Sequence, residues 1–522
     1  MDREGAELVR SKGLRSGALG LIDAIAIGVA STGPAYSIAA TLGLVAAAVA
    51  WQAPVVVILA FVPILFAAFG YDALNRAEPD AGTTFVWVSR AFGSSWGWMA
   101  GWAIIVADVL VMASLAQVAA QYTFALFGSH IGSDPGHPAV LALGIAFILV
   151  LTWLTIRGIG LTARLQAALV VIETALLVVF SVAALVRVYA GSAPAGSHRP
   201  EWSWIDPTEI SDPGHLITGI MLMVFIYWGW DSVLSVNEET RDSARTPGLA
   251  AILSTLVLVS VYVLFTVAAQ AFAGVGETGL GLANPDNADD VVAALGHAVF
   301  GDSQWGKIAV SGLVLMVLTS ATASTQTTIL PTARTAFAMS FHGAAPDVFG
   351  RAHPRFATPH VATWAMGLAS AGLYLLMDLT GGVGLVLDAV SACGVAIGFY
   401  YGMTALASAR LYSGTRLRPE HANAGRVDFR RVVLPLLGGI MLLAAAAWTA
   451  VASFDPGFGE GSWRVPGTET EIGAVFLLGI GGLAAGVPLL LAARSRYPLF
   501  RGAAFERRLP SDPGAVAPAV RD

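Results

Sequence analysis

Charged residues and cysteine are scarce in this sequence of 522 residues, and each shortage excludes a class of protein. Charged side chains make up only 12% of the chain, about half of what the surface of a soluble protein needs. Basic residues are outnumbered by acidic ones and form no long tract, which argues against nucleic acid as a partner. Cys393 is the single cysteine, so the chain has neither an internal disulfide nor a CxxC metal site.

Long apolar runs take the place of the missing charge. Hydrophobic residues supply 56% of the chain, and stretches of about 20 such residues span the hydrocarbon core of a bilayer. The first run follows an N-terminus of mixed charge and lacks a cleavage site, so we expect no cleaved signal peptide. We predict an all-α integral membrane protein with 12 transmembrane helices. The predicted spans are residues 18–48, 53–74, 97–126, 138–156, 163–188, 215–237, 248–273, 305–340, 361–379, 385–410, 431–453 and 471–493.

Basic residues are distributed unequally between the two sides of this predicted membrane protein. With the N-terminus inside, 25 of the 29 Lys and Arg residues fall on inner segments. The outer segments hold only Arg187, Arg199, Lys307 and Arg464. Because an excess of basic residues marks the cytoplasmic side, we expect both termini in the cytoplasm and the chain in the cytoplasmic (inner) membrane.

The outer loops and the C-terminal tail give weaker signals. Four tryptophans in outer loops are expected to anchor the protein at the membrane interface; they are Trp202, Trp204, Trp305 and Trp463. The outer loop at 274–303 changes from Gly-rich to acidic to amphipathic, which predicts a surface helix. The tail from residue 501 onward is polar and contains Pro, and we expect it to be disordered.

Two of the predicted spans are interrupted near the middle of the membrane. The first contains Ser-Thr-Gly-Pro at 31–34, where Pro34 removes a backbone donor and Gly33 lowers helix propensity further. The sixth contains Phe-Ile-Tyr-Trp-Gly at 225–229, and Gly229 falls at a similar depth, approached from the opposite side. Ordinary kinks are the alternative interpretation, since Gly and Pro are common in membrane helices.

Interrupted helices place polar backbone groups inside the membrane. Such groups cannot stay unpaired in lipid, so a break at mid-depth lines a protein cavity or a ligand site. The ends of half-helices offer N–H groups to a carboxylate and C=O groups to an ammonium, and an amino acid carries both. Because the two breaks are five spans apart, an odd number, a second five-span unit runs inverted relative to the first. This arrangement is typical of inverted-repeat transporters.

Asp23, Asp108, Glu173 and Asp231 lie within predicted spans, where a charge costs at least about 2.5 kcal/mol. Asp23 is close to the inner interface, and we expect a structural role for it. Asp108 and Glu173 lie near the centres of the third and fifth spans, with no Lys or Arg at that depth. Two roles stay open for each of these residues: a proton carrier, or a protonated, hydrogen-bonded acid in the core. Asp231 follows the second break and is expected either to cap the inner half-helix or to take part in coupling.

Hydroxyl and imidazole groups are clustered elsewhere in the chain. The eighth span is rich in Ser and Thr at 319–328, which suits sodium ligands, a substrate path or packing hydrogen bonds. His342, His353 and His360 lie on one inner loop at irregular spacing, and we expect no metal site there. No constellation of nucleophile or metal ligands points to catalysis, so we predict no catalytic residue, no enzyme activity and no cofactor.

Four segments of the chain resemble a known family. They are Ser-Thr-Gly-Pro at 31–34, Glu-Pro-Asp-Ala-Gly-Thr-Thr-Phe-Val-Trp at 78–87, the parts of 228–240 that read Trp-Gly-Trp-Asp and Asn-Glu-Glu-Thr, and the stretch at 334–355. On these motifs, residues 15–495 resemble a bacterial amino-acid permease of the amino acid–polyamine–organocation superfamily. The resemblance implies twelve helices in a five-plus-five inverted repeat with two extra helices. The implied units are 1–17 (cytoplasmic N-terminal segment), 18–188 (first repeat), 189–410 (second, inverted repeat), 411–495 (two additional helices) and 496–522 (cytoplasmic tail).

The resemblance also implies roles for individual residues, with the substrate between spans one, three, six, eight and ten. N–H groups at 31–33 would bind a substrate carboxylate, and carbonyls at residues 30 and 226 would bind its ammonium. Phe225 would be an aromatic gate over the substrate, and Asp108 would lie near its side chain. The predicted substrate-binding residues are Ala30, Ser31, Thr32, Gly33, Asp108, Phe225, Ile226, Tyr227 and Gly229.

One departure from the family concerns coupling. Many relatives have a lysine in the fifth span, where it stands in for a sodium ion, whereas Glu173 takes the equivalent position here. A carboxyl proton carrier or a cation-assisted site therefore replaces the lysine. We predict Glu173 and Asp231 as coupling residues, with the proton as the coupled ion and sodium as the alternative.

These features together predict a secondary active transporter that moves an amino acid or a related amine by alternating access. Its expected partners are that small molecule, a proton or a sodium ion, and the lipid bilayer. An exchanger and a sodium-coupled symporter are the alternatives within this class. An amino-acid-binding membrane sensor without net flux is the alternative from a different class.

Overall fold

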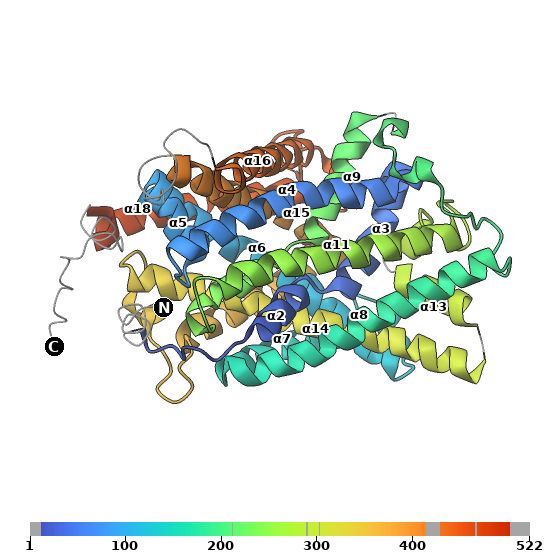
Figure 1. Cartoon of the computed structure of the whole chain (residues 1–522), viewed down its shortest axis with the longest axis horizontal. Helices are drawn as coiled ribbons and strands as arrows, with labels where there is room; N and C mark the ends of the chain where they lie inside the picture. The colour runs from blue at the N-terminus through green and yellow to red at the C-terminus, as the bar shows by residue number, and fades with distance from the viewer. Residues whose placement is uncertain are drawn as a thin grey trace.

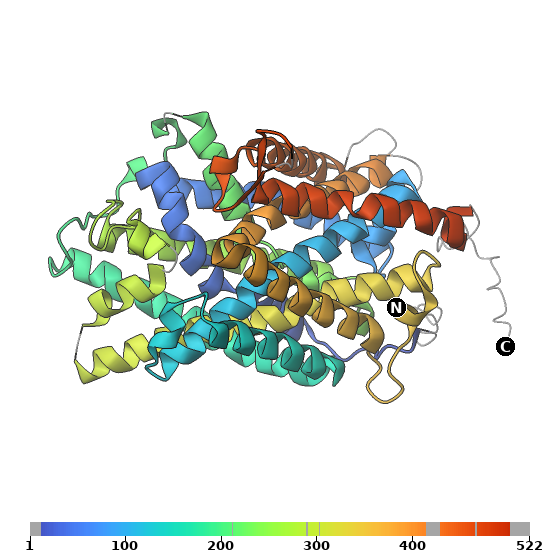
Figure 2. The same ribbon diagram turned by 180° about the vertical axis from the view of Figure 1, so that it is seen from behind.

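The protein is a bundle of long helices that share one approximate axis (Figure 1). The computed structural model describes residues 12–210, 212–288, 291–301, 303–413, 428–464 and 467–501. Disorder was predicted for the tail from residue 501, and residues 502–522 of this tail lie outside the described residues. The view from behind (Figure 2) shows the C-terminal helices lying along the outside of the bundle.

The helices that contain the predicted spans follow the expected order closely. They are α2 (Leu21–Thr32), α3 (Pro34–Val49), α4 (Ala53–Ala77), α6 (Ser94–Leu126), α7 (Pro138–Ile156), α8 (Ile159–Tyr189), α9 (Pro213–Ile226), α10 (Ser232–Ser235), α11 (Thr246–Ala273), α14 (Gln304–Phe341), α15 (His360–Ser413), α16 (Leu434–Ala452), α17 (Ala474–Ala484) and α18 (Gly486–Arg496). The shorter elements are η1 (Ala50–Gln52), α5 (Thr83–Phe92), η2 (His130–Ser133), η3 (Trp202–Ile205), η4 (Pro207–Glu209), η5 (Asn237–Glu239), α12 (Pro285–Ala288), α13 (Val291–Phe300), η6 (Asp347–Gly350), η7 (Phe429–Val433), η8 (Pro456–Phe458), η9 (Pro498–Arg501) and the strands β1 (Ser462–Arg464) and β2 (Glu471–Gly473).

Length and apolar composition identify nine helical stretches in the described residues that are able to cross a membrane. Two of these, Leu21–Ala77 and His360–Ser413, have 57 and 54 residues. At 1.5 Å per residue each is roughly 80 Å long, more than twice the hydrocarbon thickness, so each must cross twice. The shorter apolar helix Pro213–Ile226 leads into α10 and adds one more crossing. These features support twelve crossings, but the count stays a prediction because helix length alone identifies nine.

The long helix α15 begins and ends at one end of the bundle, which we call the N-terminal end because it holds Lys12. Arg355, just before α15, lines a small cavity together with Arg15. Near the other end of α15, the Tyr412 hydroxyl donates to a carbonyl in the last turns of α4, at 2.7 Å. Between them Gly382 has a φ of 61°, which interrupts the helix. The predicted spans at 361–379 and 385–410 therefore lie on the two sides of this reversal.

The loops at the opposite end differ in part from expectation. Trp202 and Trp305 are 87% and 81% exposed, as interfacial anchors should be. Trp204 is only 4% exposed because its ring stacks on Trp51 at 5.2 Å, so the prediction that it anchors the protein was wrong. The β1–β2 hairpin was not predicted, and it delays the start of the last span to Ala474.

A surface helix was predicted within 274–303, and the structure has α12 and α13 there. The helix α13 packs against α14, α3 and α8. Its side chains Val291, Val292 and Leu295 are each 1% exposed, because they face these neighbours. The amphipathic pattern thus predicted the helix correctly, and its apolar face is covered by the bundle.

The two interrupted spans lie inside the bundle, where other helices surround them. The helix α2 packs against α8, α11 and α14, and α10 packs against α2, α11 and α14. The helix α9 packs against α3, α4 and α15. Backbone groups at either break are therefore covered by protein, as irregular backbone inside a membrane must be.

Candidate functional site

The first break separates α2 from α3 at a single glycine. Gly33 adopts the left-handed conformation (φ 54°, ψ 65°), and α3 restarts at Pro34. A Cβ atom at Gly33 would lie 3.1 Å from Cβ of Ser324 on α14. Both the backbone conformation and the lack of space therefore require glycine here. The position of the break agrees with the one expected from the sequence.

The second break is longer and extends from the end of α9 to the start of α10. Gly229 has a φ of 115°, and its peptide N–H lies 3.3 Å from the Tyr401 hydroxyl on α15. The following helix α10 is only four residues long, so the inner half-helix is shorter than the predicted span. The residues of the break are fully enclosed, and Tyr227 and Trp230 have no exposed surface.

The two breaks touch each other inside the bundle. A Cβ atom at Gly229 would lie 2.7 Å from the carbonyl carbon and oxygen of Ser31 and 3.0 Å from the nitrogen of Thr32. The hydroxyls of Ser31 and Ser232 are 2.6 Å apart and share a hydrogen bond. Residues about 200 positions apart in the sequence thus form one continuous surface of irregular backbone.

A buried carboxylate caps the restarted helix α3. The peptide N–H of Ala35 donates to Oε1 of Glu173 at 2.7 Å. The Ser320 hydroxyl donates to the same oxygen at 2.6 Å, and it accepts from the Tyr36 N–H at 3.2 Å. First-turn N–H groups have no partner within their own helix, so Glu173 and Ser320 supply the partners. Glu173 is 1% exposed and, among the described residues, makes no ion pair.

The N–H groups that were predicted to bind a substrate carboxylate lie just before this cap. Ser31 and Thr32 are the last residues of α2, and the Gly33 N–H donates to the Ala30 carbonyl at 3.1 Å. Glu173 therefore lies at the N-terminus of α3, the half-helix that follows Gly33, close to the place expected for a substrate carboxylate. A second carboxylate there would meet like charge unless Glu173 carried a proton.

Carbonyl groups at both breaks already accept one hydrogen bond each. The Ile226 carbonyl accepts from the Tyr262 hydroxyl at 2.8 Å, and the Ser31 carbonyl accepts from the Ser324 hydroxyl at 2.8 Å. The Ala30 carbonyl accepts the Gly33 N–H, as described above. Each carbonyl oxygen has two lone pairs, so each retains an acceptor position for an ammonium group.

The other two acids of the site make hydrogen bonds to neighbouring helices. Asp108 accepts from the N–H and the hydroxyl of Thr332, at 3.0 and 2.6 Å, where α14 contains Pro331. Asp231 accepts from the hydroxyls of Tyr401 at 2.7 Å and Tyr400 at 3.4 Å. Asp231 occupies the N-cap position of α10 without a side-chain capping bond. The predicted capping role of Asp231 is therefore wrong, because its carboxylate accepts hydrogen bonds from the two tyrosines instead.

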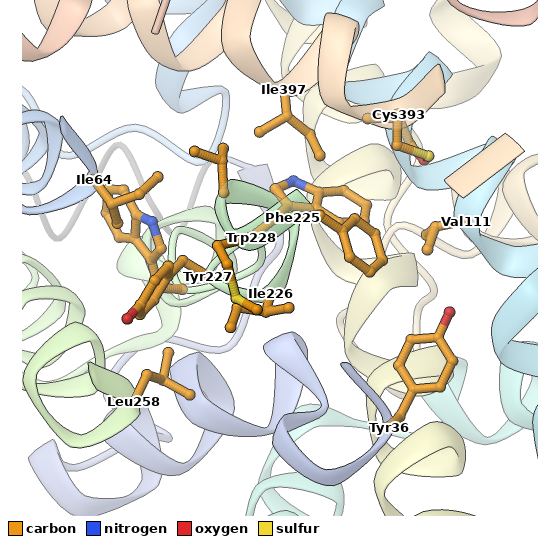
Figure 3. Packing of buried hydrophobic residues seen from close by; sticks show 14 of the residues in the cluster. Tyr36, Ile64, Val111, Phe225, Ile226, Tyr227, Trp228, Leu258, Cys393 and Ile397 are labelled. Carbon is orange, nitrogen blue, oxygen red and sulfur yellow. The ribbon is translucent and has the colours of Figure 1, made fainter. Parts of the chain in front are cut away.

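The aromatic residues of the second break point in different directions (Figure 3). Figure 3 shows Phe225 on the side of Val111 and Cys393, with the Tyr36 hydroxyl below, whereas Tyr227 lies on the other side. The Tyr227 hydroxyl donates to the Val57 carbonyl of α4 at 3.1 Å, so it is directed away from Glu173 and α14. The gate role of Phe225 stays a prediction, while the hydroxyl of Tyr227 joins the break to α4.

The structure adds residues to this site that sequence reasoning missed. Tyr400, Tyr401 and Tyr262 supply hydroxyl donors, and Ser320 and Ser324 belong to the hydroxyl-rich stretch whose function was left open. Buried Asp231 gave the only available signal for Tyr400 and Tyr401, because a carboxylate at this depth needs donors. Which helix supplies those donors depends on packing.

The three histidines at 342, 353 and 360 fall into two places. Within the part of the chain that the structure describes, no group of three or more His, Cys, Asp or Glu residues is arranged to hold a metal ion. Nε2 of His342, at the end of α14, lies 3.0 Å from Asp80, while the rings of His353 and of His360, the first residue of α15, are 5.3 Å apart.

A buried ion cluster closes the N-terminal end of the bundle. Lys12, just before the first span, forms ion pairs with Asp80 at 2.9 Å and with Glu238. His342, at the end of α14, contacts the same Asp80 carboxylate. Lys12 also lies over the ring of Phe341, 4.9 Å from its centroid. We call Lys12, Asp80, Glu238 and His342 the N-terminal latch, because they join the N-terminal segment to the ends of α4, α10 and α14.

Charge and burial act in opposite directions on the latch. Burial by itself disfavours the Lys12 ammonium, but Asp80 and Glu238 outweigh it and raise the pKa of Lys12 above its usual value. Burial disfavours the Asp80 carboxylate as well, but Lys12 and His342 hold the pKa of Asp80 well below its usual range. For Glu238, burial prevails over Lys12, and the pKa of Glu238 is raised.

A second set of contacts strengthens the same closure. Arg334 on α14 forms an ion pair with Glu239, and both side chains are nearly inaccessible, at 2% and 1% exposed. The backbone of Leu19 pairs with that of Thr240 and accepts the Arg241 N–H at 2.9 Å. The start of the first span is therefore fixed to the end of the sixth, on one side of the two breaks.

Comparison with known proteins decides the family of the chain. Residues 19–475 match the family described as amino acid permease. The chain belongs to the amino acid permease family. The family and the helical membrane fold expected from the sequence are thereby confirmed, and this permease is a multi-pass membrane transporter.

Relatives and a solved structure agree with this assignment. An uncharacterized transporter of Mycobacterium tuberculosis is 27% identical to this permease over 487 residues, which is 92% of each chain. The low-affinity putrescine importer PlaP of Escherichia coli is 27% identical over 241 residues, covering 46% of this permease and 50% of the importer. The crystal structure of MhsT in complex with L-phenylalanine shares the fold. It has a TM-score of 0.56 and 16% identity, and the match covers 82% of this permease and 98% of MhsT.

Proposed function

We propose that this permease is a secondary active transporter that carries an amino acid or a related amine by alternating access, coupled to a proton. The observation that carries the proposal is the contact between the two breaks, at which Gly229 lies against Ser31 and Thr32. Polar backbone from two half-spans meets there inside the bundle. A substrate that interacts with both segments is able to change how they pack against each other.

The proposed substrate class follows from the charges around the breaks. Asp108 and Glu173 lie in helices beside the breaks, and Asp231 lies within the second break; none of the three forms an ion pair among the described residues. An environment rich in carboxyl groups and carbonyl oxygens attracts an ammonium group. The substrate we propose therefore carries an amine, and a carboxylate on it is accommodated when Glu173 is protonated. A putrescine importer among the relatives is consistent with this chemistry.

Glu173 is the proposed proton carrier. Its Oε1 atom links the cap of α3 to Ser320 on α14, so its protonation changes the contact between two elements of the site. A neutral carboxyl group binds the Ala35 N–H less strongly than a carboxylate does. Sodium coupling is the alternative, and the hydroxyls of Ser320 and Ser324 favour it as oxygen ligands.

The proposed orientation places the N-terminal end of the bundle in the cytoplasm and the chain in the inner membrane. The excess of Lys and Arg on the predicted inner segments supports this orientation. The proposed domain organisation has two inverted five-helix repeats at 18–188 and 189–410, followed by the two additional helices at 411–495. The two helix breaks, one in each repeat, support it.

Alternating access requires the N-terminal latch to open. In the closed arrangement Lys12, Asp80 and Glu238 join three segments that must separate before a substrate reaches the cytoplasm. We propose that the structure represents a state closed toward the cytoplasm and that inward opening breaks these ion pairs.

Reconstituted vesicles test the proposal directly. Purified permease in proteoliposomes should accumulate labelled amino acid or amine when an inward proton gradient is imposed, and an ionophore that collapses the gradient should abolish accumulation. Gly33→Leu should abolish uptake with expression intact, because its side chain has no space beside Ser324. Counterflow distinguishes a transporter from a sensor. Binding without counterflow would contradict the proposal.

A further inference from the structure

Two adjoining cavities lie at the N-terminal end of the bundle, lined by residues that play no part in the helix breaks. The larger has a volume of about 510 Å³, in the range of small-molecule sites. The smaller, of about 220 Å³, includes Arg15 and Glu239 in its wall. Arg157, Arg355 and Phe356 line both cavities and therefore lie between them.

The arginines of these cavities have no acidic partner. Neither Arg157 nor Arg355 forms an ion pair with any described residue, whereas Arg334 pairs with Glu239. Four other arginines also have carboxylate partners; they are Arg76, Arg90, Arg431 and Arg464. The larger cavity has no acidic residue in its wall. Two guanidinium groups and two imidazoles thus surround a volume without any counter-charge from the protein.

Aromatic rings hold both guanidinium groups in place. Arg157 lies over Trp153 at 4.1 Å and over Phe356 at 5.6 Å from the ring centroids. Arg355 lies over the same Phe356 ring at 5.5 Å. Stacking on a ring occupies one face of a guanidinium and leaves its in-plane N–H donors available. Such donors match the oxygens of a phosphate.

The imidazoles of the larger cavity contribute two more polar groups. Nδ1 of His353 accepts the N–H groups of Arg355 and Phe356, at 3.1 and 3.3 Å. The neutral ring therefore carries its proton on Nε2, which is a donor. Nδ1 of His360 is buried and has no hydrogen-bond partner in the protein. A buried polar atom without a partner is costly.

The position of the larger cavity indicates where its ligand comes from. It lies at the end of the membrane-spanning helix α7, of which Arg157 is the C-cap. Trp153, one turn earlier, is 45% exposed on the side of the helix. Tryptophan and arginine at a helix end mark the boundary between hydrocarbon and head groups. The hydroxyl of Thr358 donates to the Ile156 carbonyl at 2.8 Å and fixes the opposite wall to α7.

We propose that the larger cavity binds the phosphate of an anionic phospholipid, with Arg157 and Arg355 as its main ligands. The acyl chains would lie along α7 beside Trp153. The absence of an acidic wall residue disfavours head groups with an added ammonium, and basic pockets at the cytoplasmic ends of membrane helices suit anionic lipids. The bound lipid would join α7 to the loop before α15 and, through the smaller cavity, approach the segment at Arg15.

A thermal-shift titration of the full-length permease in detergent tests the proposal. Short-chain phosphatidylglycerol should raise the Tm by several degrees, because a ligand that binds only the folded protein stabilises it. Short-chain phosphatidylcholine, inorganic phosphate and glycerol 3-phosphate at the same concentrations should not. An equal shift with either soluble phosphate would assign the site to a soluble anion. An equal shift with phosphatidylcholine would show that the site does not recognise the net charge of the head group. Either result overturns the proposal.

Matched variants locate the binding site. Arg157→Gln with Arg355→Gln should lose most of the shift. The control pair is Arg410→Gln with Arg430→Gln, which removes the same charge from two arginines that also lie over aromatic rings, Phe92 and Phe69. This control pair should keep the shift. A full shift in the first pair, or its loss in both pairs, contradicts the assignment.

A second measurement covers the case in which the first pair of substitutions impairs folding. Arg157→Lys with Arg355→Lys preserves the charge but removes the planar fork that fits a phosphate. Native mass spectrometry should then show fewer bound phosphatidylglycerol molecules on this pair than on the wild type. Equal occupancy would overturn the role of the two arginines.

Discussion

Glu173→Gln should flatten the pH dependence of transport while leaving the protein folded. The glutamine side-chain oxygen is able to accept the same bonds from the Ala35 N–H and the Ser320 hydroxyl, which Glu173 now accepts at 2.7 and 2.6 Å. A bond to a charged group contributes about 1.5–3 kcal/mol and a neutral one about 0.5–1.5 kcal/mol. The substitution therefore costs about 1–1.5 kcal/mol for each of the two bonds, and it removes the only titrating proton of this cap.

Glu173→Ala is the informative contrast, because it removes both acceptors. The Ala35 N–H and the Ser320 hydroxyl would be left without partners in the protein interior, at about 1–3 kcal/mol for each group. We expect the alanine variant to be less thermostable than the glutamine variant. Equal stability of the two would mean that the cap contributes nothing to folding.

The assay is uptake into proteoliposomes with the internal pH fixed and the external pH varied. Wild-type uptake should fall as the external pH rises, approaching tenfold per pH unit once the carboxyl group is mostly ionised and a single proton is required. The glutamine variant should show the same low rate at every pH. A pH profile that keeps its wild-type shape in the glutamine variant would refute Glu173 as the proton carrier.

Three further predictions follow from the same contacts. Gly229→Ala should lose uptake, because its Cβ would lie 2.7 Å from the other break, whereas Gly276→Ala, with open space around it, should transport normally. Lys12→Gln removes one partner from a buried ion cluster, which costs about 3–5 kcal/mol. The variant should make the site more accessible from the cytoplasmic side, as measured by labelling of an introduced cysteine. Unchanged accessibility would argue against a latch. The Tm deficit of Lys12→Gln should be smaller at pH 5.5 than at pH 8. In the variant Glu238 has lost its cation while burial still raises its pKa, so acidification protonates it in the folded protein and relieves its unpaired charge. Asp80 loses Lys12 as well, which holds its pKa down in the wild type, so the change acts on it in the same direction. A deficit that grows on acidification would contradict this assignment.

The fold could be predicted from the sequence because it depends on signals that are local. A run of apolar residues predicts a span, and the bounds of α7 match the predicted 138–156 without change. Gly33 and Pro34 are adjacent and together favour an interruption, so the first break could be placed to the residue. Gly229 predicted the second break, but not that α10 would be only four residues long. The length of α10 depends on contacts with α14 and α11.

The site could be predicted only in part, because its hydrogen bonds join distant segments. Glu173 was identified as a buried acid, yet nothing in the sequence pairs it with the N–H group of Ala35. Asp231 at the start of a helix predicts a cap, but two tyrosines on α15 donate to its carboxylate instead. Lys12 lies in a polar N-terminal segment, and its burial between two acids depends on how the ends of α4 and α10 meet.

Crosslinking the two breaks tests the central claim most directly. In a Cys393→Ser background, Ser31→Cys with Ser232→Cys replaces two hydroxyls that are 2.6 Å apart. Oxidation should form a disulfide between the cysteines and stop uptake, and reduction should restore it, while each single-cysteine variant transports under both conditions. Failure to crosslink, or crosslinked permease that transports at the full rate, would contradict the account of two unwound segments that meet to carry the substrate.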